Sequence, residues 1–492
     1  VAISLVLVGY FAVAQKQVNI IPEPQFVKVH TGNFTFYKNT QFIAPASWKP
    51  IAKYVQQITS TSISTLQKGN TRIIFKENKK LAASEYTLEV SSNTITIAAN
   101  DYAGALYGAQ TIVQLWYTSN TPSRIACVTV KDKPRFEYRG LMLDVSRNFY
   151  PVSFIKSLID VLSIYKINNL HLHLTDGAGW RLEIKKYPLL TKQAAFRTHK
   201  TWKEWWKNGM GYLQEGDPLA YGGYYTQNDA KDIVAYAKAK AINVIPEIEM
   251  PGHSDEVLAA YPNLACDSVK GRTGEFCIGN DSTFTFMQDV LTEVMGLFPS
   301  KYIHIGGDEA AKGHWKKCTK CQKRIKENGL KDEDELQSYA IKRMEKFISG
   351  KGRYLLGWDE ILEGGLAPGA RVMSWRGEQG GIDAARQNHD VIMTPGGTCY
   401  FDKYQQNPAG EPEAIGGFLP LQKVYEYEPL PAALEKDKQE YVKGAQANLW
   451  TEYVPTQEHA AYMIFPRIIA LSEVVWSNPA AKNWAQFQEK LT

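Results

Sequence analysis

Residues 302–309 read Tyr-Ile-His-Ile-Gly-Gly-Asp-Glu, an apolar strand that ends in two glycines and two acids. In a barrel of parallel strands, acid/base groups stand at the carboxyl ends of the strands, and glycine allows a tight turn there. Two adjacent carboxyl groups repel each other when both are ionised, so one tends to keep its proton near neutral pH. Such a group can protonate a leaving group. The alternative interpretation is an ordinary helix start, where acids suit the helix dipole.

Segments that read as strands alternate with helical segments from residue 139 onward. The eight predicted strands are 140–145, 168–175, 243–250, 302–306, 354–358, 371–375, 390–394 and 445–450. Helical periodicity is clearest at 152–165, 227–240, 282–298, 333–348 and 456–476. Eight strand–helix units predict an α/β fold of the (β/α)8 barrel type. The competing fold, a doubly wound sheet, usually begins with a Gly-rich phosphate loop, which we do not find.

The residues ahead of the barrel predict a separate small domain. Alternating apolar residues predict strands at 85–90 and 94–98, and a helix rich in Ala and Leu follows at 102–116. We therefore expect a small α/β (α+β) domain at 18–133 and the barrel at 134–492.

The first 14 residues, 1–14, are apolar and end in Ala-Val-Ala, the small-x-small pattern of signal-peptide cleavage. The run is too short to span a membrane comfortably, and polar residues follow it at once. A buried strand is the alternative interpretation. We expect 1–14 to be the remnant of a signal peptide and the protein to be exported, to the periplasm or the extracellular space, with no membrane span.

The net charge of +5 is small for 492 residues, and no long run of Lys or Arg occurs. Nucleic acid is therefore not expected as a partner. Aromatic residues are numerous, with 12 Trp, 27 Tyr and 19 Phe. Such residues fill cores, but they also stack on the apolar faces of sugar rings.

The six cysteines allow three interpretations. In an exported protein, Cys266 and Cys277 could close a short loop as a disulfide, and Cys318 and Cys321 could form a second local bridge. A zinc site would need two ligand pairs at suitable spacing, and no second pair is obvious, so we expect no metal site. Free thiols are the third interpretation, for these four as well as for Cys127 and Cys399.

Polar and aromatic residues follow most of the predicted strands. They are Asp176, His253, Asp308, Glu309, Trp358, Trp375, Tyr400, Asp402, Trp450 and Glu452. A single tryptophan at a strand end would be a core residue, but three at equivalent positions predict an aromatic-walled pocket with an acidic base. Such a pocket suits a pyranose ring, whose faces are apolar and whose edge carries hydroxyls. We place Arg139 on the rim of this pocket, although a salt bridge is its alternative role.

His171 and His173 share one face of a predicted strand, as do the paired ligands of some barrel metallohydrolases. A metal site would need further ligands, for which His253 and His304 are available. We favour the alternative, in which the pair packs in the barrel interior beside carboxylates. His253 either tunes the pKa of an acid or is an ordinary core histidine.

Together these motifs resemble glycoside hydrolase family 20, the β-N-acetylhexosaminidases. The most specific motif is His-Ile-Gly-Gly-Asp308-Glu309. Four others agree in order and spacing: Tyr-Arg139-Gly-Leu-Met-Leu-Asp-Val-Ser-Arg, Pro-Glu-Ile-Glu-Met-Pro-Gly-His253, Gly-Trp358-Asp-Glu and Asn-Leu-Trp450-Thr-Glu452. The likeness covers nearly the whole chain after the apolar start. One departure is visible, because residues 176–180 read Asp-Gly-Ala-Gly-Trp where the family commonly has Asp-Asp-Gln-Gly-Trp.

The resemblance implies an exo-acting, retaining β-N-acetylhexosaminidase without a cofactor, whose partner is a glycan with a terminal β-linked 2-acetamido sugar. It implies that Glu309 is the general acid/base and that Asp308 stabilises the acetamido group, which attacks the anomeric carbon. Tyr400 would donate to the acetamido oxygen, while His253 and Asp176 would support the acid. The implied sugar-binding residues are Arg139, Trp358, Trp375, Asp402, Trp450 and Glu452.

Two other functions stay open from the sequence. One is a metal-dependent barrel hydrolase built on His171 and His173. The other is a non-catalytic amino-sugar-binding protein, against which the intact Asp308-Glu309 pair argues. The sequence does not distinguish N-acetylglucosamine from N-acetylgalactosamine at the terminal position.

Overall fold

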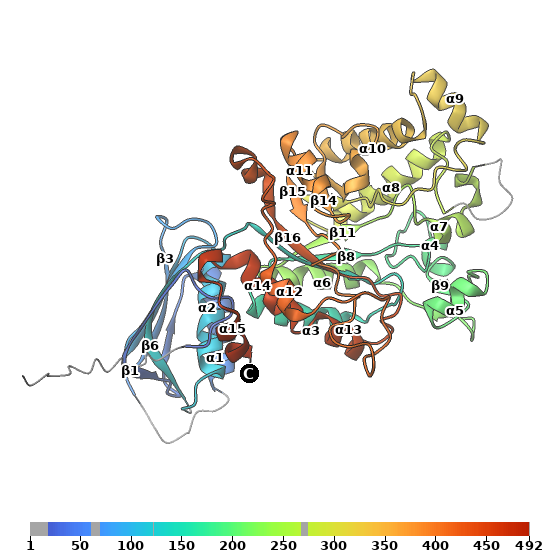
Figure 1. Cartoon of the computed structure of the whole chain (residues 1–492). Coiled ribbons are helices and arrows are strands. Elements are labelled where there is room, and N and C mark those ends of the chain that lie inside the picture. The colour runs from blue at the N-terminus through green and yellow to red at the C-terminus, as the bar shows by residue number, and fades with distance from the viewer. Residues whose placement is uncertain (1–17, 61–68, 122, 267–273, 492) are drawn as a thin grey trace, which may run out of the picture. The chain divides into compact units, whose positions relative to one another are not determined.

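The computed structural model describes residues 18–60, 69–121, 123–266 and 274–491 (Figure 1). The expected signal-peptide remnant, 1–14, lies outside these described residues.

The chain forms two compact units. The second unit is Pro134–Phe487, and the first ends at Lys133 but also includes the last residues of the chain, from Gln488. Within the first unit, Lys490 donates to the backbone carbonyl of Ile20 and pairs with the carboxylate of Glu23. The predicted barrel range of 134–492 is therefore a few residues too long at its carboxyl end.

The first unit is a six-stranded mixed sheet in the order β1-β6-β4-β5-β3-β2. Its strands are β1 (Phe26–Thr35), β2 (Gln41–Ile43), β3 (Arg72–Glu77), β4 (Tyr86–Val90), β5 (Thr94–Ala99) and β6 (Arg124–Asp132). Helices α1 (Lys49–Ser60) and α2 (Tyr102–Tyr117) lie on one face of it (Figure 1). Every second residue of β5 is buried, as a strand with one covered face requires. Helix α2 begins after Asp101, whose side chain accepts from the backbone N–H of Gly104.

The second unit is a closed barrel of eight parallel strands in the order β11-β12-β13-β14-β15-β16-β7-β8 (Figure 1). The strands are β7 (Tyr138–Asp144), β8 (Asn169–His173), β11 (Asn243–Glu247), β12 (Tyr302–His304), β13 (Tyr354–Trp358), β14 (Arg371–Ser374), β15 (Val391–Met393) and β16 (Val442–Leu449). The predicted barrel is confirmed, and the doubly wound sheet is excluded. All seven residues of β7 are buried, because neighbouring strands, side chains and helices cover both of its faces.

Helices surround the barrel strands (Figure 1). They are α3 (Val152–Ile164), α4 (Leu189–Lys192), α5 (Trp202–Lys207), α6 (Gln227–Ala239), α7 (Asp255–Ala260), α8 (Asp281–Leu297), α9 (Thr319–Glu327), α10 (Glu333–Ser349), α11 (Gln379–Arg386), α12 (Leu421–Glu426), α13 (Gln457–Ile464) and α14 (Arg467–Trp476). The last helix, α15 (Trp484–Leu491), begins in the second unit and ends in the first. Among the described residues, no helix combines the length and the apolar character needed to cross a bilayer.

One predicted helix, 456–476, is wrong in its extent. The structure divides it into α13 and α14, which are separated by Phe465 and Pro466. Proline has no N–H to donate to the preceding turn, and it disfavours the helical conformation of the residue before it.

Short elements complete the second unit. Strands β9 (Phe196–Arg197) and β10 (Tyr221–Gly222) pair in the long loop after β8. In the residues that the structure describes, the 3-10 helices of this unit are η2 (Pro262–Leu264), η3 (Asp359–Leu362), η4 (Lys436–Tyr441) and η5 (Pro479–Ala481), and η1 (Ala46–Trp48) belongs to the first unit.

Candidate active site

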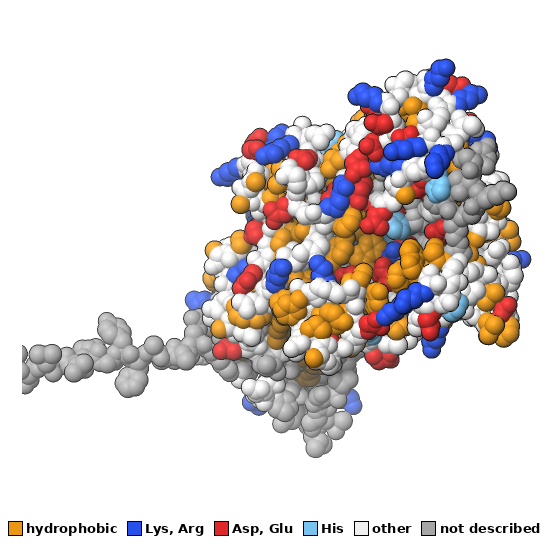
Figure 2. Space-filling model, turned by 45° about the vertical axis from the view of Figure 1, so that its right-hand side comes forward, with side chains coloured by type: hydrophobic (Ala, Val, Ile, Leu, Met, Phe, Trp, Pro, Cys, Tyr) orange, Lys and Arg blue, Asp and Glu red, His pale blue; other side chains and the backbone are white. Residues whose placement is uncertain are grey.

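A cavity of about 270 Å³ lies at the carboxyl ends of the barrel strands. Its lining is Arg147, His253, Asp308, Glu309, Trp358, Trp375, Tyr400, Asp402, Lys403, Ile415, Trp450 and Glu452. Figure 2 shows a hollow on this unit with hydrophobic side chains inside it and acidic, basic and histidine side chains around it. Nine of the eleven predicted site residues therefore line one cavity. The exceptions are Asp176, which lies just behind it, and Arg139.

The turn after β12 delivers the two acids to this cavity. Gly306 has a φ of +67° and Gly307 a φ of +95°, which is the left-handed region that favours glycine. A Cβ on Gly306 would lie 1.7 Å from a carboxylate oxygen of Glu249, so any other residue there would require the Glu249 side chain to move, in addition to the strain of the positive φ. Glu309 itself has a φ of +47°, which is uncommon for a residue with a side chain. Conformational strain of this kind gathers at functional sites.

The two acids have different environments. Asp308 is only 7% exposed, and its Oδ1 atom has no hydrogen-bond partner among the described residues. The side chain of Glu309 is 60% exposed. A buried carboxylate oxygen without a donor is costly, so the site is suited to a ligand that brings an N–H or O–H group to Asp308.

His253 connects these acids to the barrel interior. Its Nε2 lies 3.5 Å from both Asp308 Oδ2 and Glu309 Oε2, and its Nδ1 lies 3.3 Å from Asp176 Oδ2. Burial alone would lower the pKa of His253, but Asp176 and Asp308 outweigh it and raise that pKa well above its usual value. The hydrogen bond with His253 in turn lowers the pKa of Glu309. A histidine cation therefore stands between three carboxylates.

Asp176 forms ion pairs with two further cations, Arg147 and His173. Arg147 Nη2 lies 2.7 Å from Asp176 Oδ2, and His173 Nε2 lies 3.2 Å from the same atom. Burial favours a neutral Asp176, but Arg147 and His253 outweigh burial and hold its pKa below the usual range. His173 continues the chain of contacts to Glu247, with Nδ1 2.5 Å from Oε2. Burial would lower the pKa of His173, but mainly Glu247 raises it to about 10.

The remaining histidines of the interior share the same carboxylate. His171 Nε2 lies 3.1 Å from Glu247 Oε2, and His304 Nδ1 lies 2.9 Å from Glu247 Oε1. Burial lowers the pKa of His171 to about 4, so this ring is neutral. Neither these two histidines nor His173 lines the cavity. His171 and His173 are therefore packed in the barrel interior beside the carboxylate of Glu247, as their interior-packing interpretation predicted.

Three tryptophans and a tyrosine form the walls. Trp358 Nε1 donates to Glu247 Oε1 at 2.9 Å, and Trp375 Nε1 donates to Glu360 Oε2 at 2.9 Å. The rings of Trp375 and Tyr400 are stacked, with centroids 6.1 Å apart and planes 14° apart. Because both indole N–H groups are satisfied within the protein, the aromatic faces remain for apolar contact with a ligand.

The side of the cavity next to Trp450 is charged. Arg147 Nη2 lies 3.6 Å from Glu452 Oε1, and its guanidinium lies 5.1 Å from the centre of the Trp450 ring. Asp402 is 4% exposed, and its Oδ1 has no hydrogen-bond partner within the described parts of the chain. Burial, together with the charge of Glu452, raises the pKa of Asp402 to about 7. These groups offer acceptors and a donor to sugar hydroxyls.

The predicted site role of Arg139 is wrong. Arg139 is the second residue of β7, so it lies at the amino end of the barrel, and it is 1% exposed. Its Nε donates to the carbonyl of Lys166 at 2.8 Å, and its Nη1 donates to the carbonyl of Phe136 at 2.8 Å. Arg147, which follows the carboxyl end of β7, occupies the cavity instead. The predicted strand already indicated this difference, because Arg139 precedes the strand and Arg147 follows its carboxyl end, where the site residues of a barrel lie.

Sequence reasoning missed other residues of the site. Lys403 and Ile415 line the cavity from the long loop after β15, where no periodic pattern marks them. Glu360 had been noted only as part of a motif. Burial, and then the charge of Asp308, raises the pKa of Glu360 to about 8.

A second cavity of about 280 Å³ shares Glu309, His253, Arg147 and Glu452 with the first. Its further lining includes Asp176, Gly177, Asp255 and three tryptophans of α5, Trp202, Trp205 and Trp206. Glu309 therefore belongs to both cavities. The departure from the family motif at residue 177 lies in the wall of this second cavity.

Comparisons with known proteins agree with this geometry. The profile of the glycosyl hydrolase family 20 catalytic domain matches residues 136–479, and the profile of domain 2 of that family matches residues 17–133. A β-hexosaminidase of Porphyromonas gingivalis is 46% identical, over 97% of this chain and 62% of that protein. A β-hexosaminidase of Vibrio furnissii is 34% identical, over 92% of this chain and 76% of that protein. This chain thus spans less than two thirds of the length of the P. gingivalis relative.

Solved structures are similar over almost the whole chain. An exo-β-N-acetylglucosaminidase from Vibrio harveyi, in complex with N-acetylglucosamine, has a TM-score of 0.86 and 31% identity, covering 96% of this chain and 76% of that one. A β-N-acetylhexosaminidase from Bacteroides fragilis has a TM-score of 0.82 and 30% identity, covering 97% of this chain and 94% of that one. By sequence, fold and the arrangement of its strand-end residues, this chain belongs to glycosyl hydrolase family 20.

Proposed function

We propose that the protein is an exo-acting, retaining β-N-acetylhexosaminidase that releases terminal β-linked N-acetylglucosamine or N-acetylgalactosamine from glycans. The observation that carries the proposal is the pair of acids on the glycine turn, with Asp308 buried at the cavity wall and Glu309 between two cavities. The names of the relatives support the same activity.

In the first step, the acetamido oxygen of the substrate attacks its own anomeric carbon. The bond from that carbon to the glycosidic oxygen breaks, and Glu309 gives its proton to the departing oxygen. The product is an oxazolinium-type ring whose nitrogen carries developing positive charge. Asp308, whose Oδ1 has no other partner among the described residues, accepts from the N–H and stabilises this charge. Tyr400 donates to the acetamido oxygen and holds it for attack.

In the second step, Glu309, now ionised, removes a proton from water as the water attacks the anomeric carbon. The oxazolinium ring opens, the acetamido group is restored, and the sugar leaves with its original anomeric configuration. Two displacements at one carbon give net retention. No protein nucleophile is needed, which distinguishes this mechanism from that of most retaining glycosidases.

The environment of Glu309 suits both steps. In the structure, His253 lowers the pKa of this carboxyl, which favours the ionised form needed as a base. A bound substrate would cover the exposed side chain, and burial raises the pKa of a carboxyl group, which favours the protonated form needed as an acid. We propose that His253, backed by Asp176, acts as a positioning residue for this exchange.

The two cavities have different proposed ligands. The first holds the terminal sugar, with its hydroxyls on Arg147, Glu452 and Asp402 and its faces against the tryptophan walls. Because an acid that protonates the glycosidic oxygen must lie between the sugar and the leaving group, we assign the second cavity to the leaving group. Trp202 and Trp206, whose rings are stacked 5.2 Å apart, would form its apolar wall.

We also propose that the protein is exported. The support for this is the apolar segment 1–14 with its Ala-Val-Ala end.

The experiment is a comparison of aryl β-glycosides that differ in the substituent at the second carbon of the sugar or in the configuration at the fourth carbon. Turnover of the β-N-acetylglucosaminide and the β-N-acetylgalactosaminide should exceed turnover of the plain β-glucoside by at least on the order of 10³, because the glucoside lacks the internal nucleophile. The deacetylated glycoside, which keeps a nitrogen but no carbonyl oxygen, should be equally poor. Similar rates on all four glycosides would overturn the proposal.

The same samples separate the two other candidate functions. Binding of N-acetylglucosamine without any hydrolysis would identify a non-catalytic sugar-binding protein. Hydrolysis that is lost on treatment with a chelator, and restored by a metal ion, would favour a metal-dependent hydrolase.

A further inference from the structure

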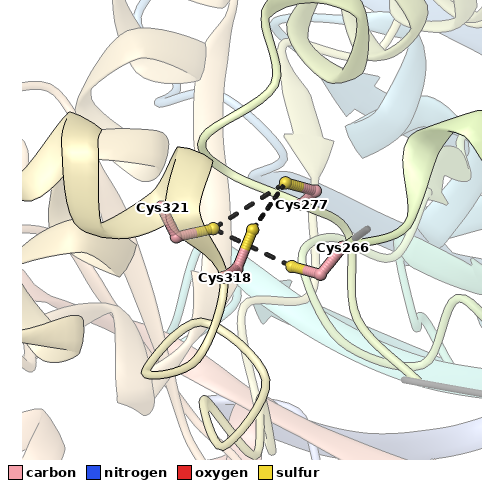
Figure 3. Close-up of side chains that lie close together, drawn as sticks. All are labelled: Cys266, Cys277, Cys318 and Cys321. Atoms are coloured by element: carbon pink, nitrogen blue, oxygen red, sulfur yellow. Dashed lines mark hydrogen bonds between the residues drawn. The ribbon is translucent and has the colours of Figure 1, made fainter. Parts of the chain in front are cut away.

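Four cysteines from distant parts of the second unit meet in its interior (Figure 3). We call Cys266, Cys277, Cys318 and Cys321 the cysteine cluster. Cys277 Sγ lies 3.7 Å from Cys318 Sγ and 3.8 Å from Cys321 Sγ, and Cys266 Sγ lies 3.9 Å from Cys321 Sγ. All four sulfur atoms lie within 4.8 Å of one another, and all four residues are buried.

The cluster corrects the earlier interpretation of these cysteines. None of the six cysteines forms a disulfide in the structure, so the local bridges Cys266–Cys277 and Cys318–Cys321, one of the alternatives that the sequence left open, are not present. A second ligand pair for zinc is not apparent from the spacing of the cysteines along the chain. The fold supplies this second pair by bringing distant residues together. Cys318 contacts Cys277, 41 residues before it, and Cys321 contacts Cys266, 55 residues before it.

We propose that the cysteine cluster is a structural zinc site. A zinc–thiolate bond is about 2.3 Å long, so in a regular tetrahedron of four such bonds the sulfur atoms are about 3.8 Å apart. The three sulfur–sulfur distances given above, 3.7, 3.8 and 3.9 Å, match this spacing. Four thiolates leave no coordination position for water or a substrate, so the ion would be structural rather than catalytic.

The surroundings of the cluster suit thiolates. The backbone N–H of Gly279 points to Cys321 Sγ at an N···S distance of 3.3 Å. Any side chain on Gly279 would collide with the backbone of Lys320, since a Cβ there would lie 2.2 Å from its carbonyl carbon. Cys318 is the residue before α9, and Cys321 lies in the first turn of this helix, whose amino end favours negative charge.

The charge balance points the same way. Four thiolates and one zinc ion have a net charge of −2, which needs compensation. The segment 316–320, which includes Cys318, contains Lys316, Lys317 and Lys320 and no acid.

The site joins the segments that carry the proposed catalytic residues. Beside Cys277, the N–H of Phe276 donates to the carbonyl of Pro251 at 2.9 Å, two residues before His253. Trp315 lies in the segment that follows Glu309, three residues before Cys318, and its Nε1 donates to the carbonyl of Phe276 at 2.8 Å. An ion that binds Cys277 and Cys318 together would hold these two segments at a fixed separation. Zinc would therefore fix the distance between His253 and Glu309, a consequence that rests on the proposed function.

The first experiment measures metal content in the full-length purified protein by inductively coupled plasma mass spectrometry. The expected result is one zinc per chain. The variants Cys277→Ser and Cys318→Ser should lose it, whereas Cys127→Ser, which changes a buried cysteine of the other unit, should retain it. Absence of zinc together with an intact mass lower by four hydrogens would show two disulfides instead. Absence of zinc at the full reduced mass would show free thiols. Either result overturns the proposal.

A second measurement does not depend on the folding of the serine variants. Wild-type protein treated with a chelator and then loaded with Co²⁺ should show the intense d–d and sulfur-to-cobalt charge-transfer bands of tetrahedral cobalt thiolate. Treatment with the chelator alone should lower Tm, and Zn²⁺ should restore it. A weak octahedral cobalt spectrum would overturn the proposal. None of these readouts uses turnover, so zinc bound to a protein without hexosaminidase activity would contradict only the proposed function.

Discussion

Arg139 and Arg147 stand eight positions apart at the two ends of β7, and their environments are opposite. At the amino end, the Arg139 guanidinium donates to backbone carbonyls and lies 5.0 Å from the centre of the Trp476 ring. At the carboxyl end, Arg147 faces the carboxylates of Asp144, Asp176 and Glu452. Arg139 thus satisfies buried backbone carbonyl groups, whereas Arg147 belongs to a network of charged side chains at the cavity.

This difference extends to the two ends of the whole barrel. The carboxyl end concentrates carboxyl groups whose pKa is shifted, such as Asp402 at about 7, mainly because of burial, and Glu360 at about 8, for the same reason and because of Asp308. Shifted pKa values of this kind are typical of functional sites. In this fold, therefore, the position of a residue along its strand decides whether it contributes to stability or to chemistry. Changes at the carboxyl end should alter rates more than stability.

The largest effect is expected from Glu309→Gln. The amide keeps the size of the side chain but cannot give or take the proton, so kcat/KM should fall by about 10²–10⁴. The loss should be smallest for aryl glycosides whose leaving group needs no protonation and largest for alkyl glycosides. Tm should hardly change, because the side chain is 60% exposed. An equal loss for all leaving groups would contradict the general-acid role.

Asp308→Asn should have the second largest effect. Its kcat should be lower by about 10²–10³, because a preorganised charge is lost. Unlike the previous variant, its loss should not depend on the leaving group. Stability should change little, because the neutral amide removes both the repulsion that raises the pKa of Glu249 and Glu360 and the attraction that stabilises the charged form of His253. A strong dependence on the leaving group, measured with the same series of substrates, would contradict this assignment.

The matched pair Arg147→Lys and Arg139→Lys tests the comparison directly. Lysine keeps the charge but loses the planar fork of donors. Arg147→Lys should lower kcat/KM by about tenfold, equivalent to one lost hydrogen bond to a charged group. Arg139→Lys should leave kcat/KM unchanged and cost about 1–3 kcal/mol of unfolding free energy, because a buried carbonyl loses its donor. Steady-state kinetics and thermal unfolding of both variants measure these effects, and the opposite pattern would refute the division between the two ends.

The smallest expected effect is a shift in pH dependence for His253→Gln. His253 lowers the pKa of Glu309, so its removal should raise that pKa. The alkaline limb of kcat/KM reports loss of the protonated acid in the free enzyme, so it should move to higher pH, by about one unit or less. A limb that stays in place, or moves to lower pH, would contradict the contact between His253 and Glu309.

The stability of the same variant provides a control. Because Asp176 and Asp308 outweigh burial and raise the pKa of His253, the charged ring stabilises the fold below the ordinary histidine pKa. This contribution is lost as the pH rises through the raised pKa. The Tm of the wild type should therefore exceed that of His253→Gln most at acidic pH, and the difference should shrink at alkaline pH.

Much of the fold was predictable because its signals are local. Each of the eight barrel strands is a short apolar run bounded by polar or Gly-rich segments, and each occurs in the structure within a few residues of the prediction. The helix predicted at 456–476 failed at Pro466, where apolar periodicity continues through a residue that cannot continue a helix. A closer reading of that proline would have divided the segment.

The walls and acids of the candidate site were also predictable, because they follow the carboxyl ends of the strands. The prediction for Arg139 was wrong because Arg139 lies at the amino end of the strand, whereas the cavity lies at the carboxyl end, which Arg147 follows. Glu360 follows the carboxyl end of β13 and was therefore open to the same inference, whereas Lys403 could not have been assigned from the sequence, because it lies in the long loop after β15, which has no repeating pattern.

The sequence by itself determined the barrel, the glycine turn and the acids that follow it, because apolar periodicity and glycine conformation depend on neighbours along the chain. Only the tertiary structure decided which arginine faces the cavity, which carboxyl groups have shifted pKa values, and which cysteines meet. These properties depend on distances across the barrel, between residues that closure of the sheet and its loops brings together from far apart in the chain.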